Sequence, residues 1–244
     1  MKNIAAIILA AGEGKRMNSR KINKVVFTLG GKQMILHIID RLERLLISPI
    51  IVVVGHGKKS VMKVLDGRAI FAEQSKRLGT AHAVSRALKK LSPNVQTVLV
   101  FNGDDSSFYK KDIVKKLIET HLEKKSALSF LTITVNNPFG LGRVIRNNNG
   151  GVIEIVEEKD ATEKERKINE INPACYIFEI SFLKKYLKQV KKSPISGEYY
   201  LTSLIDIAIK NNEKIETVKG GKILWRGVNT PEELKEAERL FLHS

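Results

Sequence analysis

Strand-like and helix-like patterns alternate along the first half of the chain. Continuous apolar runs indicate strands that are buried on both faces, whereas apolar residues repeated every three or four positions indicate helices. By these criteria we expect strands at Ile4–Leu9, Ile50–Val54, Thr97–Phe101 and Leu128–Val135, and helices at Met34–Leu46, Thr80–Leu91 and Lys111–Lys124. This order predicts an α/β fold with a mostly parallel central sheet and helices on both faces.

The second half of the chain changes character, because a hairpin signal interrupts the alternation. The strand-like runs Arg143–Arg146 and Val152–Val156 flank Asn147-Asn148-Asn149-Gly150-Gly151, a sequence typical of a tight hairpin turn. The other expected elements are a strand at Ala174–Phe178, helices at Phe182–Val190 and Leu201–Lys210, and a last helix over residues 231–242 that Thr230 caps before Pro231. With no repeat, low-complexity tract or linker, we expect residues 1–244 to form one domain with a β-hairpin insertion.

Composition and charge narrow the class of function. With 43% hydrophobic residues among 244, the chain can bury a sizeable core, and no apolar stretch approaches the roughly 20 residues of a membrane-spanning helix. The lack of a secretory pattern and the single Cys175 indicate a reducing cytoplasm. A net charge of +16 favours nucleic-acid binding. Lysine outnumbers arginine, however, and lies mostly on solvated helix faces, so we expect small-molecule partners and neither nucleic acid nor membrane.

Small residues and cations follow the first expected strand, in the sequence Leu9-Ala10-Ala11-Gly12-Glu13-Gly14-Lys15-Arg16-Met17. At the carboxyl edge of a parallel sheet, the backbone of such a loop can approach a phosphate or a base. A dinucleotide fingerprint would need glycine at Met17, and a P-loop would need four residues between its glycines, so neither motif fits. A simple glycine-rich turn is the alternative interpretation.

A carboxylate is expected at the same edge of the sheet. Asn102-Gly103-Asp104-Asp105 follows the third expected strand. A carboxylate that faces a phosphate-binding loop is a common way to hold Mg²⁺, which prefers one or two carboxylates together with phosphate oxygens. Asp104 is equally consistent with an ordinary turn, so this segment leaves metal binding open.

These segments resemble the signature of the sugar-phosphate nucleotidyltransferase family. The resemblance includes residues 9–17 and Lys24-Val25 and covers essentially the whole chain. The further matches, in the same order, are Gln74 with residues 78–83, residues 102–104, residues 140–143, residues 155–162, residues 170–172, residues 198–202 and residues 227–229. The sequence is most similar to the N-terminal uridyltransferase domain of the bacterial enzymes that also transfer an acetyl group. The resemblance implies a Rossmann-like nucleotidyltransferase sandwich with the hairpin on the sugar side.

The resemblance also implies a role for each matching residue. Those roles are catalysis for Arg16 and Lys24; nucleotide binding for Leu9, Ala10, Ala11, Gly12, Gly14, Gln74, Gly79, Thr80 and Gly103; sugar-phosphate binding for Gly142, Glu157 and Asn172; and Mg²⁺ binding for Asp104 and Asn229. The implied reaction is attack of N-acetylglucosamine-1-phosphate on the α-phosphorus of UTP, giving UDP-N-acetylglucosamine and pyrophosphate. The alternatives are the same chemistry on another sugar-1-phosphate or pyrimidine nucleotide, and a non-catalytic regulatory protein that binds a nucleotide sugar.

Three positions depart from the family pattern. Asp105-Ser106-Ser107-Phe108 stands where a small or apolar residue and proline usually follow Asp104, so the extra carboxylate either adds a metal contact or caps the following helix with one of the serines. Pro173-Ala174 replaces the usual Thr-Gly beside Asn172, and Ser203 replaces an acidic residue. The sequence ends where the family's left-handed β-helix domain begins, so we expect no acetyl transfer and a monomer or small homo-oligomer.

Overall fold

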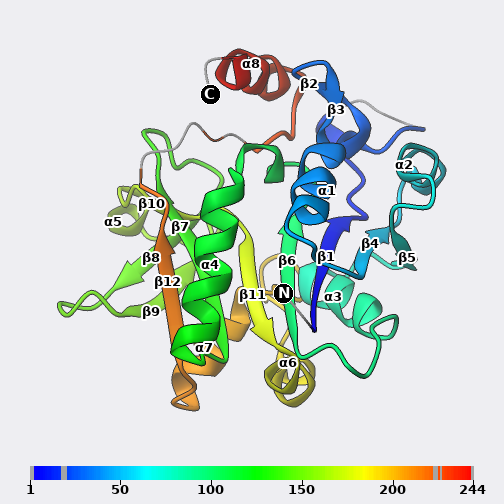
Figure 1. Cartoon of the computed structure of the whole chain (residues 1–244). Coiled ribbons are helices and arrows are strands. Elements are labelled where there is room, and N and C mark those ends of the chain that lie inside the picture. The colour runs from blue at the N-terminus through cyan, green and yellow to red at the C-terminus, as the bar shows by residue number, and fades with distance from the viewer. Residues whose placement is uncertain (1–2, 18–20, 222–224, 226, 243–244) are drawn as a thin grey trace.

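A ten-stranded sheet with helices on both faces forms the centre of the computed structural model, which describes residues 3–17, 21–221, 225 and 227–242 (Figure 1). The strands of this sheet are β1 (Ile4–Ala10), β4 (Ile50–Val54), β5 (Ile70–Glu73), β6 (Thr97–Asn102), β7 (Leu128–Thr134), β8 (Gly142–Arg146), β9 (Val152–Val156), β10 (Glu170–Asn172), β11 (Cys175–Glu179) and β12 (Ile215–Lys219). Their order is β5-β4-β1-β6-β11-β7-β10-β8-β9, and β12 pairs with β7 beside this path. A small ribbon consists of β2 (Thr28–Leu29) and β3 (Lys32–Gln33).

Helices cover both faces of this sheet, as expected. They are α1 (Met34–Arg44), α2 (Lys58–Leu65), α3 (Thr80–Leu88), α4 (Lys111–Lys124), α5 (Glu163–Arg166), α6 (Ile180–Tyr186), α7 (Ser203–Lys210) and α8 (Pro231–Leu242), with short 3₁₀ turns η1 (Lys15–Met17), η2 (Lys24–Val26), η3 (Ser106–Phe108) and η4 (Leu187–Gln189). Alternate residues of β1 belong to two hydrophobic cores, one that includes α1 and α4 and one that includes α3, α6 and α7. Because β1 is buried on both faces, its sequence is a continuous apolar run.

Parallel pairing brings several loops to one edge of the sheet. β1 pairs in parallel with β4 and β6, and β4 pairs in parallel with β5. The segments that follow these strands therefore leave the sheet at the same edge: the loop after Ala10, Gly55, Gln74 and Gly103. The predicted mostly parallel α/β architecture is confirmed.

A strand of opposite direction separates the two halves of the sheet. β11 lies between β6 and β7 and is antiparallel to both. β10 lies along the same edge of β7 as β11. Ile171 of β10 pairs with Ile133 of β7, and Tyr176 of β11 pairs with Phe130 of β7. The chain therefore advances five residues on one side while β7 advances three. The extra residues form a bulge at Pro173-Ala174, where Ala174 has a φ of 57°.

Several expected elements are confirmed, and others were missed. The hairpin of β8 and β9 forms as predicted and joins the main sheet through β10. The helix expected from Phe182 begins two residues earlier as α6 and ends in the turn η4. The patterns did not predict α2, β5 or β12, because each is short and only partly buried. No helix among the described residues is long and apolar enough to cross a membrane.

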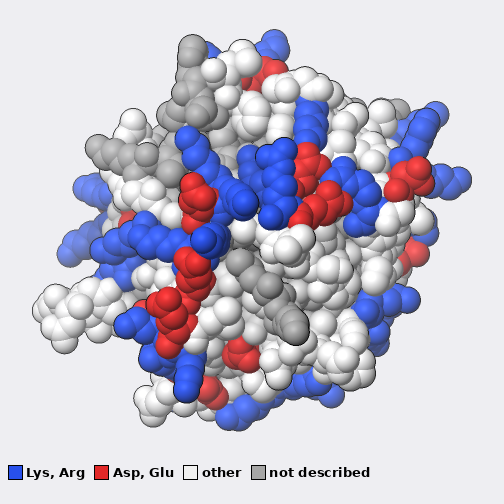
Figure 2. Space-filling model, viewed as in Figure 1, with Lys and Arg blue, Asp and Glu red and all other residues white. Residues whose placement is uncertain are grey.

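The positive charge is mixed with negative charge on the face that carries α1 and α4. Figure 2 shows Lys and Arg on this face interleaved with Asp and Glu. Ion pairs explain part of the mixing, since Arg68 lies 2.6 Å from both Asp40 and Glu43, and Lys115 lies 3.5 Å from Glu119. A mixed face differs from the single-sign surface that nucleic-acid binding favours. The expectation of small-molecule partners stays a prediction.

Candidate active site

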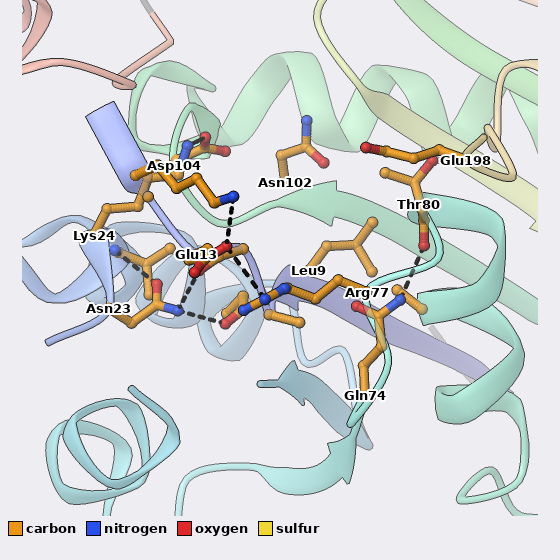
Figure 3. A pocket seen from close by; sticks show the side chains of 18 of the residues that line it. Leu9, Glu13, Asn23, Lys24, Gln74, Arg77, Thr80, Asn102, Asp104 and Glu198 are labelled. Carbon is orange, nitrogen blue, oxygen red and sulfur yellow. Dashed lines mark hydrogen bonds and ion pairs between the residues drawn. The ribbon is translucent and has the colours of Figure 1, made fainter. Parts of the chain in front are cut away.

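A cleft follows the sheet edge at which β1 and β6 end. Its larger part encloses about 720 Å³ (Figure 3), and its smaller part encloses about 260 Å³. Leu9, Thr80, Asn102 and Asp104 line both parts, so the two parts are continuous. A cleft of this size suits a nucleotide beside a smaller second ligand.

The structure brings almost all of the predicted site residues to this cleft. The larger part is lined by the residues predicted for catalysis and nucleotide binding: Leu9, Ala10, Ala11, Gly12, Gly14, Arg16, Lys24, Gln74, Gly79 and Thr80. The smaller part is lined by the residues predicted for the sugar phosphate and by one predicted metal ligand: Gly142, Glu157, Asn172 and Asn229. Asp104 lines both parts and therefore lies at their junction.

Gly103 is the exception among the predicted residues, because it does not line either part of the cleft. Its N–H donates to the Leu9 carbonyl over 3.0 Å. A Cβ at this position would lie 3.0 Å from Val25 Cγ1 and 3.2 Å from the Leu9 oxygen. Glycine thus lets β6 end close against β1, and the predicted contact of Gly103 with a nucleotide stays a prediction.

Asn23 organises the glycine loop, although the sequence did not single it out. Its side chain is buried, and Nδ2 donates to the carbonyls of Ala10 (2.9 Å), His56 (2.8 Å) and Gly12 (3.2 Å). Its Oδ1 accepts from the N–H of Val25 at the start of η2. One amide therefore joins the ends of β1 and β4 to the segment that carries Lys24. The only signal in the sequence was its position next to the Lys24-Val25 match.

Gln74 has a fixed orientation in the larger part of the cleft. Its Nε2 donates to the Gly79 carbonyl over 3.0 Å and lies 3.0 Å from Nδ1 of His82. Burial, and then the charge of Arg86, lowers the pKa of His82, so the ring is neutral at pH 7 and its Nδ1 accepts. Both hydrogens of Nε2 are used in this way. The oxygen Oε1 is left to accept a hydrogen bond from a ligand.

A cation already lies between the two predicted metal ligands. The Lys24 ammonium donates to Asp104 Oδ2 and, over 2.8 Å, to Asn229 Oδ1. These side chains of Lys24 and Asp104 are only 12% and 17% exposed. The carboxylate oxygen of Asp104 and the amide oxygen of Asn229 thus point at one cation. Oxygen ligands are the type that Mg²⁺ prefers, so the residues present fit the ion. Among the described residues no cluster of three or more His, Cys, Asp or Glu could hold a metal, so phosphate oxygens and water would complete its coordination.

The start of α8 holds Asn229 in place. Glu233 accepts from the N–H groups of Asn229 (2.6 Å) and Thr230 (3.1 Å), while its own N–H donates to the Thr230 hydroxyl over 3.1 Å. This reciprocal capping confirms the predicted helix start. The N–H of Val228 donates to the Asp104 carbonyl over 3.4 Å. The C-terminal segment is thereby tied to the loop that carries the predicted metal ligand.

The smaller part of the cleft offers both hydrogen-bond donors and acceptors. The Thr202 hydroxyl donates to the Glu157 carboxylate over 3.0 Å, while burial raises the pKa of Glu157. Asn172 Nδ2 donates to the Tyr176 hydroxyl, and Asn172 Oδ1 accepts from the N–H of Ala174 over 3.1 Å. Carboxylate and amide groups of this kind recognise hydroxyl and acetamido substituents.

No side chain of the segment after Asp104, neither Asp105 nor a serine, caps α4, so the capping alternative is wrong for that helix. The N-cap position of α4 is Lys110, which makes no side-chain cap. Asp105 is buried, its Oδ2 accepts a long bond of 3.5 Å from Asn102, and the side chain of Tyr109 lies close enough to its carboxyl to lower the pKa of Asp105. Burial, and then the charge of Asp104, raises the pKa of Asp105 well above its usual value. A metal contact for Asp105 stays a prediction.

Comparison with known proteins settles the family. The family model described as "Nucleotidyl transferase" matches residues 5–244. The chain belongs to the nucleotidyl transferase family. This nucleotidyl transferase is 45% identical over 241 residues to a bifunctional protein GlmU from Caldicellulosiruptor saccharolyticus, and 38% identical over 236 residues to one from Bacillus licheniformis. It covers 52% and 51% of these proteins, while 98% and 96% of its own chain is matched, so it spans about half the length of the curated relatives.

A solved structure shows the same fold. The nucleotidyl transferase superposes with a TM-score of 0.81 on a crystal structure from Bacillus anthracis, assigned as a glucose-1-phosphate thymidylyltransferase in complex with a sucrose. The match covers 98% of this chain and 95% of the other, at 22% sequence identity. The likeness confirms the nucleotidyltransferase sandwich that the motifs implied.

Proposed function

We propose that the chain transfers a uridylyl group from UTP to N-acetylglucosamine-1-phosphate in a Mg²⁺-dependent reaction that releases pyrophosphate. The observation that carries the proposal is the position of Asp104 at the junction of the two parts of the cleft, with Lys24 and Asn229 around it. A sugar-phosphate oxygen forms the new bond to the α-phosphorus, and the bond to the β-phosphate breaks. The whole activity of the longer relatives is not implied, because the chain covers only half of them.

Charge neutralisation is the main task of the residues in the cleft, since the reaction brings two anions together. Lys24 and Arg16 line the larger part of the cleft and would contribute positive charge there, together with Lys15, Arg77 and Lys159. Asp104 and Asn229 would hold Mg²⁺, which neutralises phosphate oxygens and orients them when it is bound. The glycine loop contributes backbone N–H groups, and no side chain is required as a nucleophile.

The orientation of Gln74 is compatible with a uracil base. Because Nε2 is used by Gly79 and His82, Oε1 can only accept, and the base must present an N–H group to it. Uracil and thymine carry such a group at N3, and cytosine carries one as its 4-amino group. The contact is therefore compatible with each pyrimidine, and the resemblance to uridyltransferases favours UTP.

The polar lining of the smaller part supports an N-acetylated sugar. Glu157 can accept hydrogen bonds from sugar hydroxyls, and its carboxylate is held by Thr202. Asn172, at the end of β10, lines the same part of the cleft, where its amide can meet an acetamido group. Among sugar-1-phosphates we therefore expect those with an acetamido group to react fastest.

Pyrophosphate release from defined substrate pairs tests the proposal. The chain is incubated with UTP, dTTP or CTP against a panel of sugar-1-phosphates that includes the N-acetylglucosamine and glucose derivatives, each with Mg²⁺ and with EDTA. We expect the highest kcat/KM for UTP with N-acetylglucosamine-1-phosphate and no turnover in EDTA. Faster turnover with another pair would reassign the substrate. No turnover with any pair, combined with tight binding of a nucleotide sugar in calorimetry, would favour a regulatory protein.

A further inference from the structure

A buried tyrosine connects the two segments that depart from the family pattern. Tyr109 follows η3 and is fully buried. Its hydroxyl donates to the carbonyl oxygen of Pro173, which lies 64 positions later in the chain. Burial raises the pKa of Tyr109 well above its usual value, and the charge of the nearby Asp105 carboxyl raises this pKa further. Tyr109 therefore lies against both the loop after Asp104 and the segment after Asn172.

The carbonyl of Pro173 depends on this hydroxyl because it belongs to a bulge. Residues 171–176 contain two more steps than the facing residues of β7, so the regular ladder is interrupted at Pro173-Ala174. Proline has no N–H, and the N–H of Ala174 is bonded to Asn172 Oδ1. The hydroxyl of Tyr109 is thus the donor that fixes the bulge from outside the strand.

The bulge in turn fixes a predicted ligand of the sugar phosphate. Asn172 lies immediately before it, and both ends of the Asn172 amide are held locally, by Ala174 and by Tyr176. A shift of the bulge would therefore move the whole amide group. Gln74 and Asn23, which shape the nucleotide part, have no hydrogen bond to this segment among the described contacts.

The same tyrosine also lies close to the C-terminal segment. The indole N–H of Trp225 is near the Tyr109 hydroxyl and lowers the pKa of Tyr109. Trp225 is buried, lines the smaller part of the cleft and precedes Asn229 by four residues. The hydroxyl thus lies next to segments that carry Asp104, Asn172 and Asn229.

We propose that Tyr109 is a positioning residue that holds Asn172 in register with Asp104 through its hydrogen bond to the Pro173 carbonyl. The inference rests on the proposed function and adds a specificity element for the sugar phosphate. Removing the hydroxyl leaves the Pro173 carbonyl buried without a donor, so the bulge relaxes and Asn172 moves. The nucleotide part is expected to keep its geometry.

Tyr109→Phe tests this role, with Tyr186→Phe as the matched control. Tyr186 lies on α6, away from the cleft, and is also buried. Its hydroxyl donates to the Glu213 carboxylate over 2.7 Å. We expect Tyr109→Phe to raise the KM for the sugar-1-phosphate about tenfold, the equivalent of one lost hydrogen bond, while the KM for UTP changes less than about twofold. Tyr186→Phe should leave both KM values within about twofold. Equal changes in both KM values, or the same KM values in the two variants, would overturn the proposal.

Amide hydrogen exchange separates this inference from the proposed function. In the wild type, the amides of Ala174 and Cys175 should be protected far more than those of the turn at residues 147–151. Tyr109→Phe should remove that protection, whereas Tyr186→Phe should keep it. Fast exchange at Ala174 and Cys175 in the wild type would overturn the inference even if Tyr109→Phe does not fold. A wild-type protein without turnover would instead refute the proposed function and leave the exchange result valid.

Discussion

Replacement of Asn23 by alanine is expected to destabilise the protein and to weaken nucleotide binding. The side chain makes bonds of 2.8 and 2.9 Å to the carbonyls of His56 and Ala10, a longer bond to Gly12, and accepts from Val25. Each carbonyl left unsatisfied in the interior costs about 1–3 kcal/mol, and loss of a helix cap costs about 1 kcal/mol. The bonds to Gly12 and His56 are only partly buried, so those two carbonyls can find water. One buried carbonyl, that of Ala10, and one helix cap remain, so we expect a loss of about 2–4 kcal/mol.

The variant should remain folded, since domains of this kind have a free energy of unfolding of about 5–15 kcal/mol. Urea unfolding measures the loss, and the KM for UTP should rise about tenfold because the glycine loop is no longer tied to β1 and β4. Asn211→Ala is the control: Asn211 also donates to a carbonyl, that of Ile207 over 2.8 Å, but it is exposed, so a change within about 0.5 kcal/mol is expected.

A second replacement tests the direction of the same hydrogen bonds. Asn23→Asp keeps the shape of the side chain but turns a carboxylate oxygen toward the three carbonyls. Burial raises the pKa of such a carboxyl, so this variant should be less stable than Asn23→Ala at pH 7 and should regain stability as the pH falls through the raised pKa. A loss below about 1 kcal/mol in Asn23→Ala, or an unchanged KM for UTP, would refute the role assigned to Asn23.

Three further predictions follow from the cleft. Ala174→Gly should raise the free energy of unfolding by about 0.5–1 kcal/mol, because φ of 57° is strained for alanine, and an unchanged thermal midpoint would contradict this. Asp104→Ala should abolish turnover, because the proposed metal site loses its carboxylate. Cooperative unfolding should be retained, because within the described part of the protein only the ion pair with Lys24 is lost. Retained activity would remove Asp104 from the metal site. The KM for UTP should rise as the pH falls through the lowered pKa of His82, because a protonated Nδ1 cannot accept from Gln74. The unfolded state takes up this proton at a higher pH than the folded state, so His82 also lowers the free energy of unfolding below about pH 6.5. Both pH effects should be absent in His82→Phe.

The strands of the nucleotide half could be predicted from sequence because they are buried on both faces. The run Ile50–Val54 is observed with the same bounds, and β1 and β6 each extend one residue beyond the prediction. The direction of a strand leaves no trace in its own pattern. The antiparallel insertion of β11 between β6 and β7 therefore could not be read from Ala174–Phe178.

The predicted site residues came together because their motifs follow parallel strands. The glycine loop and Asp104 follow β1 and β6, whose ends must share one edge of the sheet. Asn23 could not be predicted in this way, since its acceptors lie in two other segments, the glycine loop (Ala10 and Gly12) and the loop after β4 (His56). Tyr109 was missed for the same reason, because its partner Pro173 is defined only by the bulge.

The placement of β11 also governs the order in which the protein can be assembled during synthesis. β6 and β7 are made early, but the strand that pairs with both lies at Cys175–Glu179. Until that segment has left the ribosome, β6 and β7 each keep an open edge, which invites pairing with other chains. Nascent chains that stop before Cys175 are therefore expected to depend on chaperones. That dependence should fall once Cys175–Glu179 is available, and again once β12 covers the other edge of β7.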